Sequence, residues 1–259
     1  MKKLFFIAML HACACPVVFA GGGEPATKKT PATQDAKLVL RFRPRVDNRP
    51  LVLNDSSNHY KNANGDDYVV TTFKYYVSNV CLIRRNGEKV LLPDSYLLVN
   101  SADSASLEQA LPAIPAGKYT AIEFIIGVDS ARNFAGAQTG CLDPARGMFW
   151  NWNTGYIFVK MEGVSSKSTA RQNRLTFHIG GAKSPNNTVR TFTQPLPHTL
   201  KVRNGHAPRI DVDVNAAALF RGKTQVDFAK LNFTMGGPNS VVIADNYAEG
   251  LFTVTGVQK

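Results

Sequence analysis

Hydrophobic residues in this chain fall in short runs in which apolar and polar positions alternate. Leu38, Leu40 and Phe42 alternate with polar neighbours, which is the period of a strand with one buried face. Residues 68–83 are dense in β-branched and aromatic side chains, and residues 117–129 have a fully apolar centre. Further strands are predicted at residues 89–92, 96–100, 156–161, 174–179, 189–192 and 210–214.

No long amphipathic helix separates these runs. The sequence therefore predicts an all-β protein, a β-sandwich with Greek-key-like connections and one or two short helices. The helices are expected around residues 216–220 and 240–249, with one helical turn within residues 104–110. Asn86 and Gly87 lie between two predicted strands and indicate a β-hairpin, because both central residues of a two-residue turn need a positive φ.

The first 36 residues differ from the rest in composition. Lys2 and Lys3 precede a short apolar run, and Val18-Phe19-Ala20 has the small-residue pattern that signal peptidase reads. We therefore assign residues 1–20 to a signal peptide, residues 21–36 to a flexible linker and residues 37–259 to one folded domain. The apolar run is too short to span a membrane. We expect an exported protein of the periplasm or outer surface.

A lipoprotein is the alternative interpretation of the same segment. Leu10-His11-Ala12-Cys13 loosely resembles a lipoprotein cleavage box, which would leave a lipidated Cys13 as a membrane anchor. Histidine is a poor residue inside such a box, so we favour the unlipidated form.

The chain is basic, with a formal net charge of +11. A basic chain can indicate nucleic-acid binding, but export argues against it, and the basic residues are scattered. Arg41, Arg43 and Arg45 alternate with apolar residues and would line one face of a strand. We interpret this face as solvated, with attraction to an anionic surface or partner as the alternative.

Two cysteines, Cys81 and Cys141, lie outside the signal segment. In an oxidising compartment they could form a disulfide that closes a long loop. Neither lies in a Cys-x-x-Cys pattern, so nothing supports thioredoxin-like redox chemistry or covalent haem attachment.

A long irregular connection lies between the predicted strand that ends near Asp129 and the one that starts near Tyr156, and it contains both tryptophans of the chain, Trp150 and Trp152. A connection this long in a compact domain is usually functional or disordered, and its aromatic residues argue against disorder. If the backbone there is extended, the two indoles share one face. They are interpreted either as large core or lid residues or as a redox group.

The residues around this connection resemble the MbnP-like family, in the branch found in Bacteroidetes-type bacteria. The resemblance covers about residue 37 to the end. Its central motif is Gly147-Met148-Phe149-Trp150-Asn151-Trp152 followed by Gly155-Tyr156-Ile157-Phe158. Supporting motifs are Phe73-Lys74-Tyr75-Tyr76-Val77-Ser78-Asn79, His178-Ile179-Gly180-Gly181 and Ile243-Ala244-Asp245-Asn246-Tyr247.

The resemblance implies an exported β-sandwich that is associated with copper. Copper-linked members bind the metal through histidines and kynurenine, an oxidised tryptophan that a partner diheme peroxidase of the MauG type produces. The resemblance makes Trp150 or Trp152 the candidate for oxidation and His178 the candidate metal ligand. Copper-linked relatives often carry Asn-His where this chain has Asn133-Phe134, so one expected ligand is missing.

The residues themselves leave the metal chemistry open. Copper can be held by converging imidazoles, but the histidines outside the signal segment form no recognisable spacing; they are His59, His178, His198 and His206. Alternation turns His178 away from the face of Leu175 and Phe177, where it could be either a structural histidine or a ligand. Calcium is a further possibility, because oxygen-bearing side chains bracket the tryptophans: Asp129, Asn133 and Asp143.

No nucleophile elbow, His-Glu-x-x-His helix or phosphate-binding glycine loop is present, so we expect no enzyme. Two function classes remain. The first is a copper- or redox-linked binding protein with a MauG-type peroxidase as its partner. The second is a non-metal exported accessory domain whose tryptophan loop packs a core or contacts a partner.

Overall fold

The computed structural model describes residues 36–57, 59–150, 155–203 and 205–258, without the side chains of residues 112 and 113. The predicted signal peptide, the linker up to residue 35, the lipidation candidate Cys13 and the second tryptophan, Trp152, lie outside the described residues. The described part belongs to one compact unit, residues 34–259.

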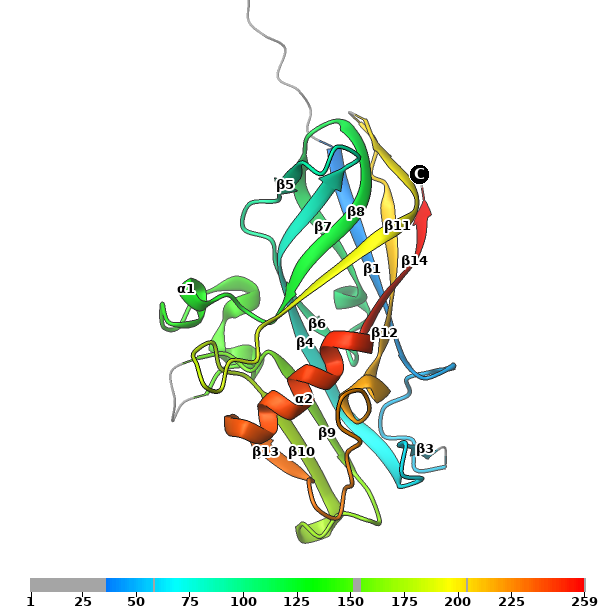
Figure 1. The fold of residues 1–259 in the computed structure, drawn as a ribbon, viewed down its shortest axis with the longest axis vertical. Helices are drawn as coiled ribbons and strands as arrows, with labels where there is room; N and C mark the ends of the chain where they lie inside the picture. The colour runs from blue at the N-terminus through cyan, green and yellow to red at the C-terminus, as the bar shows by residue number, and fades with distance from the viewer. Residues whose placement is uncertain (1–35, 58, 151–154, 204, 259) are drawn as a thin grey trace, which may run out of the picture. The chain divides into compact units, whose positions relative to one another are not determined.

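Two β-sheets make up the domain and confirm the predicted all-β sandwich (Figure 1). The smaller sheet has the order β14 (Phe252–Gln258), β12 (Arg209–Asn215), β1 (Ala36–Val46), β2 (Arg49–Pro50), with β7 (Glu108–Ile114) also paired to β1. The larger sheet has the order β11 (Arg190–Val202), β8 (Gly117–Ile126), β4 (Asp67–Arg84), β9 (Val159–Val164), β10 (Arg174–Ile179), β13 (Phe233–Met235). Three further strands pair with β4: β3 (Tyr60–Lys61), β5 (Lys89–Leu91) and β6 (Tyr96–Asn100).

Both sheets are mixed, because β1 runs parallel to β12 and β10 runs parallel to β13. Short helical segments connect the strands: α1 (Ser130–Asn133), α2 (Gly237–Gly250), η1 (Ser104–Leu107), η2 (Gly140–Leu142), η3 (Pro144–Arg146), η4 (Arg171–Asn173) and η5 (Ala216–Leu219). None of the described helices is long and apolar enough to cross a membrane.

Alternation in β1 produces the expected one-sided burial. Leu38, Leu40 and Phe42 are buried, and the arginines between them point to the other face. There Arg43 Nε donates to Asp213 Oδ1 at 2.7 Å, and Arg45 pairs with the same carboxylate. The arginines of this stripe are therefore paired with carboxylates of the smaller sheet, Arg41 with Glu108 and both Arg43 and Arg45 with Asp213.

The turn between β4 and β5 differs from the prediction in its geometry. The hairpin forms, but Gly87 has a φ of +84° and Asn86 is not among the residues with positive φ. The Gly87 amide donates to Arg84 O, and the Arg84 amide donates to Glu88 O. The loop is thus a three-residue turn with one left-handed glycine rather than a two-residue turn.

Aromatic rings fill the core between the two sheets. The Phe252 ring of β14 lies 5.5 Å from the Tyr75 ring of β4, 5.1 Å from Phe124 of β8 and 6.5 Å from Phe42 of β1. All of these rings except Phe252 have an exposed fraction of 1% or less, and Phe252 is 5% exposed. Edge-to-face packing of this kind adds to the free energy gained by burying the rings.

A second aromatic group closes the core beside α2. The Phe220 ring lies 4.8 Å from Phe228, 5.1 Å from Phe177 and 5.5 Å from Tyr68. Asn246 of α2 fixes this region, since its Nδ2 donates to Leu219 O and Thr224 O. The helix thereby holds the chain between η5 and β13 over the end of the larger sheet.

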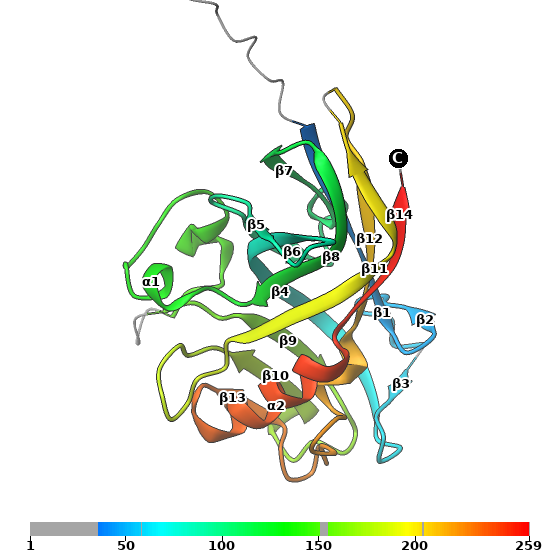
Figure 2. The same cartoon turned by 45° about the horizontal axis from the view of Figure 1, so that its top comes forward.

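β4 is buried on both faces at its centre, where Tyr75 and Tyr76 are each 0% exposed. Tyr75 faces the smaller sheet, so Tyr76 faces the opposite side of the larger sheet, which we call the outer face. Ten buried residues form the outer cluster on this face: Tyr76, Leu98, Val128, Leu142, Met148, Trp150, Tyr156, Ile157, Phe158 and Ala182. Figure 2 shows α1 and its loop on this side, away from β1, β12 and β14.

The predicted disulfide is not formed, and both cysteines are free. Cys81 lies on β4 between Leu91 of β5 and Glu123 of β8. Cys141 lies in η2, where its Sγ contacts Tyr96 O at 3.1 Å. The two thiols do not meet, because Cys81 is paired with β5 and β8 whereas Cys141 lies beside Tyr96 of β6.

Phe220→Ala should reduce the free energy of unfolding by about 3–5 kcal/mol, because it opens a cavity among three other rings. Phe233→Ala is the matched control, since that phenylalanine is 54% exposed. Urea unfolding of both variants measures the difference. Equal losses in the two variants would contradict the assignment of Phe220 to the core.

Candidate functional site

The connection between β8 and β9 crosses the outer face of the larger sheet. Its first residue is tied to the sheet by the Gly127 amide, which donates to Tyr76 O at 3.0 Å. At its end the Phe158 amide donates to Ile179 O of β10 at 2.6 Å. The Tyr76 hydroxyl donates to Cys141 O at 2.9 Å, so the middle of the connection is also fixed.

Asn133 and Tyr156 hold the connection in shape. The buried Asn133 side chain accepts a hydrogen bond from the Tyr156 amide at 2.8 Å. The Tyr156 hydroxyl donates to Leu142 O at 2.8 Å, and its ring packs edge-on against Tyr76 at 5.8 Å. These contacts place residues 148–150 and 155–158 on the sheet without a strand of their own beyond the single bridge Phe149–Tyr156.

Trp150 lies over Gly180 in the outer cluster and is only 6% exposed. A Cβ on Gly180 would come within 2.7 Å of Trp150 Cη2 and 2.4 Å of Tyr156 O. No side chain larger than hydrogen fits at this position, so Gly180 is required for the edge of the indole to pack against the backbone directly after β10. The far end of the indole reaches toward Gly236, before α2.

A pocket of about 240 Å³ opens beside the Trp150 indole. Its described lining consists of Asn133, Phe134, Trp150, Gly155, Gly180, Gly181, Ala182, Lys183, Asn186, Gly236 and Gly237. The charged side chain in this lining is Lys183, whose Nζ lies 4.2 Å from the centre of the Phe134 ring. The pocket therefore offers an aromatic edge, glycine backbone and one cation.

His178 lies in β10, two residues before Gly180, which follows the end of the strand. In an extended backbone both positions share the outer face at a separation of about 7 Å. The imidazole is 8% exposed, and its Nε2 lies 2.7 Å from Glu162 Oε1. Lys160 Nζ lies 3.5 Å from the same oxygen. The hydrogen bond from His178 and the charge of Lys160 lower the pKa of Glu162 to about 2, although burial opposes the shift.

Met235 is the direct partner of His178 in the parallel pair β10–β13. Thr234 is buried and contacts Ser240 of α2 at 3.0 Å, whereas Phe233 is exposed. Alternation therefore turns Met235 to the outer face, the same side as His178. Neighbouring strands lie about 5 Å apart, so the Met235 and His178 side chains leave the sheet from adjacent positions.

The hard-ion candidates have structural roles in the loop. Asp129 caps α1 by accepting from the Arg132 amide at 3.1 Å, and it also accepts from the Tyr96 hydroxyl. Burial raises the pKa of Asp129, but these hydrogen bonds outweigh it and the net shift is downward. Asp143 caps η3 by accepting from the Ala145 amide at 2.9 Å. Each group thus stabilises the fold of the loop itself.

The histidines do not converge in the structure. His59 Nδ1 contacts Asp67 at 3.0 Å, and His198 and His206 lie near the turn between β11 and β12. Within residues 36–258, apart from the few undescribed positions, no group of three or more His, Cys, Asp or Glu side chains is arranged to hold a metal ion. A metal ion at His178 would therefore need further ligands other than His, Cys, Asp or Glu side chains.

Comparison with known proteins shows the family to which the chain belongs. The model of the MbnP family matches residues 35–240. The chain belongs to the MbnP family. Among solved structures, MbnP from Methylosinus trichosporium is similar over 73% of this chain and 82% of that chain, with 13% sequence identity and a TM-score of 0.42. No curated protein matches.

The MbnP match includes the tryptophan loop, His178 and Met235. It confirms the family that the motif around Trp150 indicated. Sequence reasoning missed three residues of the site, Glu162, Lys183 and Met235. Alternation from Lys160 could have placed Glu162 on the face of His178, but no sequence signal pairs Met235 with His178, because 57 residues separate them.

Glu162→Gln should remove an acid-sensitive part of the stability. The pKa of Glu162 is lowered from 4.5 to about 2, so its ion pair stabilises the folded state above pH 4.5. That contribution should fall as the pH drops from about 4.5 to about 2. Urea unfolding across this range should therefore show a shallower pH dependence in Glu162→Gln than in the natural chain. The exposed Glu249→Gln is the control, and an identical profile in all three proteins would exclude the pair.

Proposed function

We propose that this protein is an exported member of the MbnP family that binds copper at His178, with Met235 as its second donor. The single observation that supports this function is the local arrangement on the outer face. Glu162 holds the imidazole through Nε2, and Met235 is in register with His178 on the next strand. The predicted signal peptide accounts for export to the periplasm or surface.

The hydrogen bond to Glu162 prepares His178 as a ligand. When the Nε2–H of the neutral imidazole donates a hydrogen bond to the carboxylate, Nδ1 carries the lone pair and can bind a metal. A carboxylate that orients a ligating histidine and raises its basicity is a common feature of metal sites. The lowered pKa of Glu162 keeps the carboxylate ionised over the physiological range.

The donor set selects the oxidation state of the metal. A thioether is a soft ligand that favours copper(I), whereas copper(II) prefers a square arrangement of nitrogen and oxygen donors. The described residues contain no cluster of three or more His, Cys, Asp or Glu that could supply the latter. An imidazole with one thioether fits copper(I) better, and Lys160 beside Glu162 limits the negative charge of the site.

Tryptophan oxidation by a diheme peroxidase of the MauG type is a second part of the proposal. Trp150 supports it, since the edge of the indole packs against Gly180, two residues after His178, and borders the pocket. Oxidation there would add polar donors within the same outer cluster. Trp152 stays the alternative target and lies outside the described residues.

Copper(I) titration against a competing chelator tests the metal site. The natural chain should bind one ion, His178→Ala should lose it, and Glu162→Gln should weaken binding about 10–100-fold because the imidazole is no longer oriented. Met235→Leu keeps the shape but removes the sulfur, and should also weaken binding. His198→Ala is the control histidine. Unchanged affinity in His178→Ala would refute the proposal.

The second candidate function is that of a non-metal accessory domain whose pocket beside Trp150 takes a small ligand or a side chain of a partner. The lining observed there favours it, because Lys183 is a cation and no described carboxylate faces it. Such a pocket suits a neutral or anionic group that carries hydrogen-bond acceptors and packs on the indole edge. Phe134 in place of a histidine fits this use as well.

Native mass spectrometry of the protein from a copper-replete envelope of its own host separates the two candidates. Bound copper, with a mass shift on a tryptophan peptide, would support the metal role and the peroxidase partner. A bound organic species that is lost in Lys183→Glu but retained in the exposed control Lys167→Glu would support the pocket. A protein that is purified without a bound metal and that does not bind added copper would contradict the copper role.

A further inference from the structure

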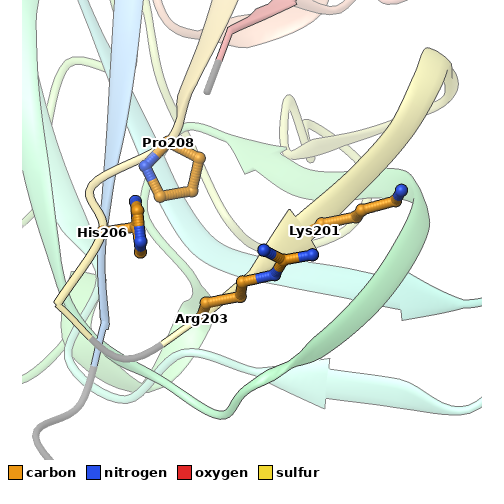
Figure 3. Close-up of a pocket in the computed structure, with 4 residues that line it drawn as sticks. All are labelled: Lys201, Arg203, His206 and Pro208. Carbon is orange, nitrogen blue, oxygen red and sulfur yellow. The ribbon is translucent and has the colours of Figure 1, made fainter.

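A basic pocket lies at the end of the domain where β11 turns into β12. It has a volume of about 150 Å³ and is lined by Lys201, Arg203, His206 and Pro208. Figure 3 shows the Arg203 side chain extending toward Lys201, with His206 and Pro208 on the other side of the hollow. Three of these four residues are basic and none is acidic.

The strand register adds a further cation at this end. Lys118 of β8 is the direct partner of Lys201 of β11. Like charges directly opposite each other in a sheet destabilise it. Both lysines are exposed, and neither forms an ion pair among those found in the described residues. A sheet tolerates such a pair at lower cost when an anion lies between the ammonium groups.

Two carboxylates of the smaller sheet, Glu108 and Asp211, form ion pairs with arginines and not with these lysines. Glu108 binds Arg41 at 3.0 Å and lies 3.8 Å from Arg209. Asp211 binds Arg209 at 3.1 Å. Arg41 and Arg209 of the smaller sheet are thus paired with carboxylates. Among the described residues, no ion pair is found for Lys118, Lys201 or Arg203, so their positive charges are not balanced by a carboxylate.

We propose that this basic pocket binds a phosphoryl group. The two cations of the lining, Lys201 and Arg203, together with the neighbouring Lys118, suit an anion with more than one negative charge, which a single carboxylate does not provide. The guanidinium of Arg203 can bind two phosphate oxygens at once, and lysine adds a compact charge. His206 contributes a ring N–H donor.

A neighbouring hollow leaves room for the rest of a phosphorylated molecule. It has a volume of about 430 Å³ and shares Lys201 and Pro208 with the basic pocket. His198, Leu200 and Val257 also line it, so it combines polar and apolar surface. A phosphoryl group at Arg203 could therefore belong to a lipid headgroup or to a soluble phosphate compound.

The basic pocket is independent of the proposed copper site. β8 begins at Gly117 beside the pocket and ends at Ile126, where the tryptophan loop starts. Ten residues of strand separate the two ends by about 30 Å. A protein that does not bind copper could therefore still bind a phosphoryl group, and a protein that does not bind a phosphoryl group could still bind copper.

The test compares inorganic phosphate in solution with phosphatidylglycerol vesicles, using the full mature chain at constant ionic strength. Phosphate binding is measured by calorimetry and vesicle binding by co-sedimentation, with phosphatidylcholine vesicles as the neutral reference. The variant is Lys201→Gln with Arg203→Gln. The control, Lys167→Gln with Arg171→Gln, removes the same charge from an exposed loop.

We expect the pocket variant to bind at least about tenfold more weakly than the natural chain, because two charge-assisted hydrogen bonds are lost. The control should bind as the natural chain does. Binding of phosphate in solution would identify a soluble ligand, and binding of anionic vesicles alone would identify a headgroup. No binding of either probe, or equal losses in variant and control, would overturn the proposal.

Discussion

Burial of β4 on both faces is the constraint on which the rest of the structure depends. Tyr75 and Tyr76 are neighbours, so they point in opposite directions, yet both are fully covered. The smaller sheet covers Tyr75, and Phe252 packs on it. The connection between β8 and β9 covers Tyr76 with its own aromatic residues, and Leu98 of β6 and Ala182 complete the outer cluster. The position of Trp150 follows from this need to close the second face.

The candidate site occupies the boundary between that covered area and the polar part of the outer face. Gly180 supports the indole, and two residues earlier on the same strand His178 meets Glu162. His178 lies in β10 and Gly180 directly follows this strand, so the indole and the imidazole occupy neighbouring positions on the outer face.

Much of the fold could be predicted from the sequence where alternation is clear. The predicted strands at residues 96–100 and 174–179 coincide with β6 and β10, and the helix at 240–249 lies within α2. β7, β13 and β14 were not predicted. β7 contains a proline and β13 has three residues, so neither shows a clear period. β11 was predicted far too short, because Pro195 and Pro197 interrupt its pattern.

The site was less predictable, because its contacts join distant segments. His178 was expected to face away from Leu175 and Phe177, and it does. Its neighbours on that face depend on strand order, which local sequence does not contain. The expected disulfide failed for the same reason, since spacing alone could not show that β4 carries Cys81 away from Cys141.

The parallel pairing of β1 with β12 has a consequence for how the chain reaches its native state. Arg43 and Asp213 meet across this pair although 170 residues lie between them. The smaller sheet cannot close until nearly the whole polypeptide is available, and contacts of such long range slow folding. A newly made chain therefore stays without its smaller sheet until β12 and β14 have been synthesised and can join β1.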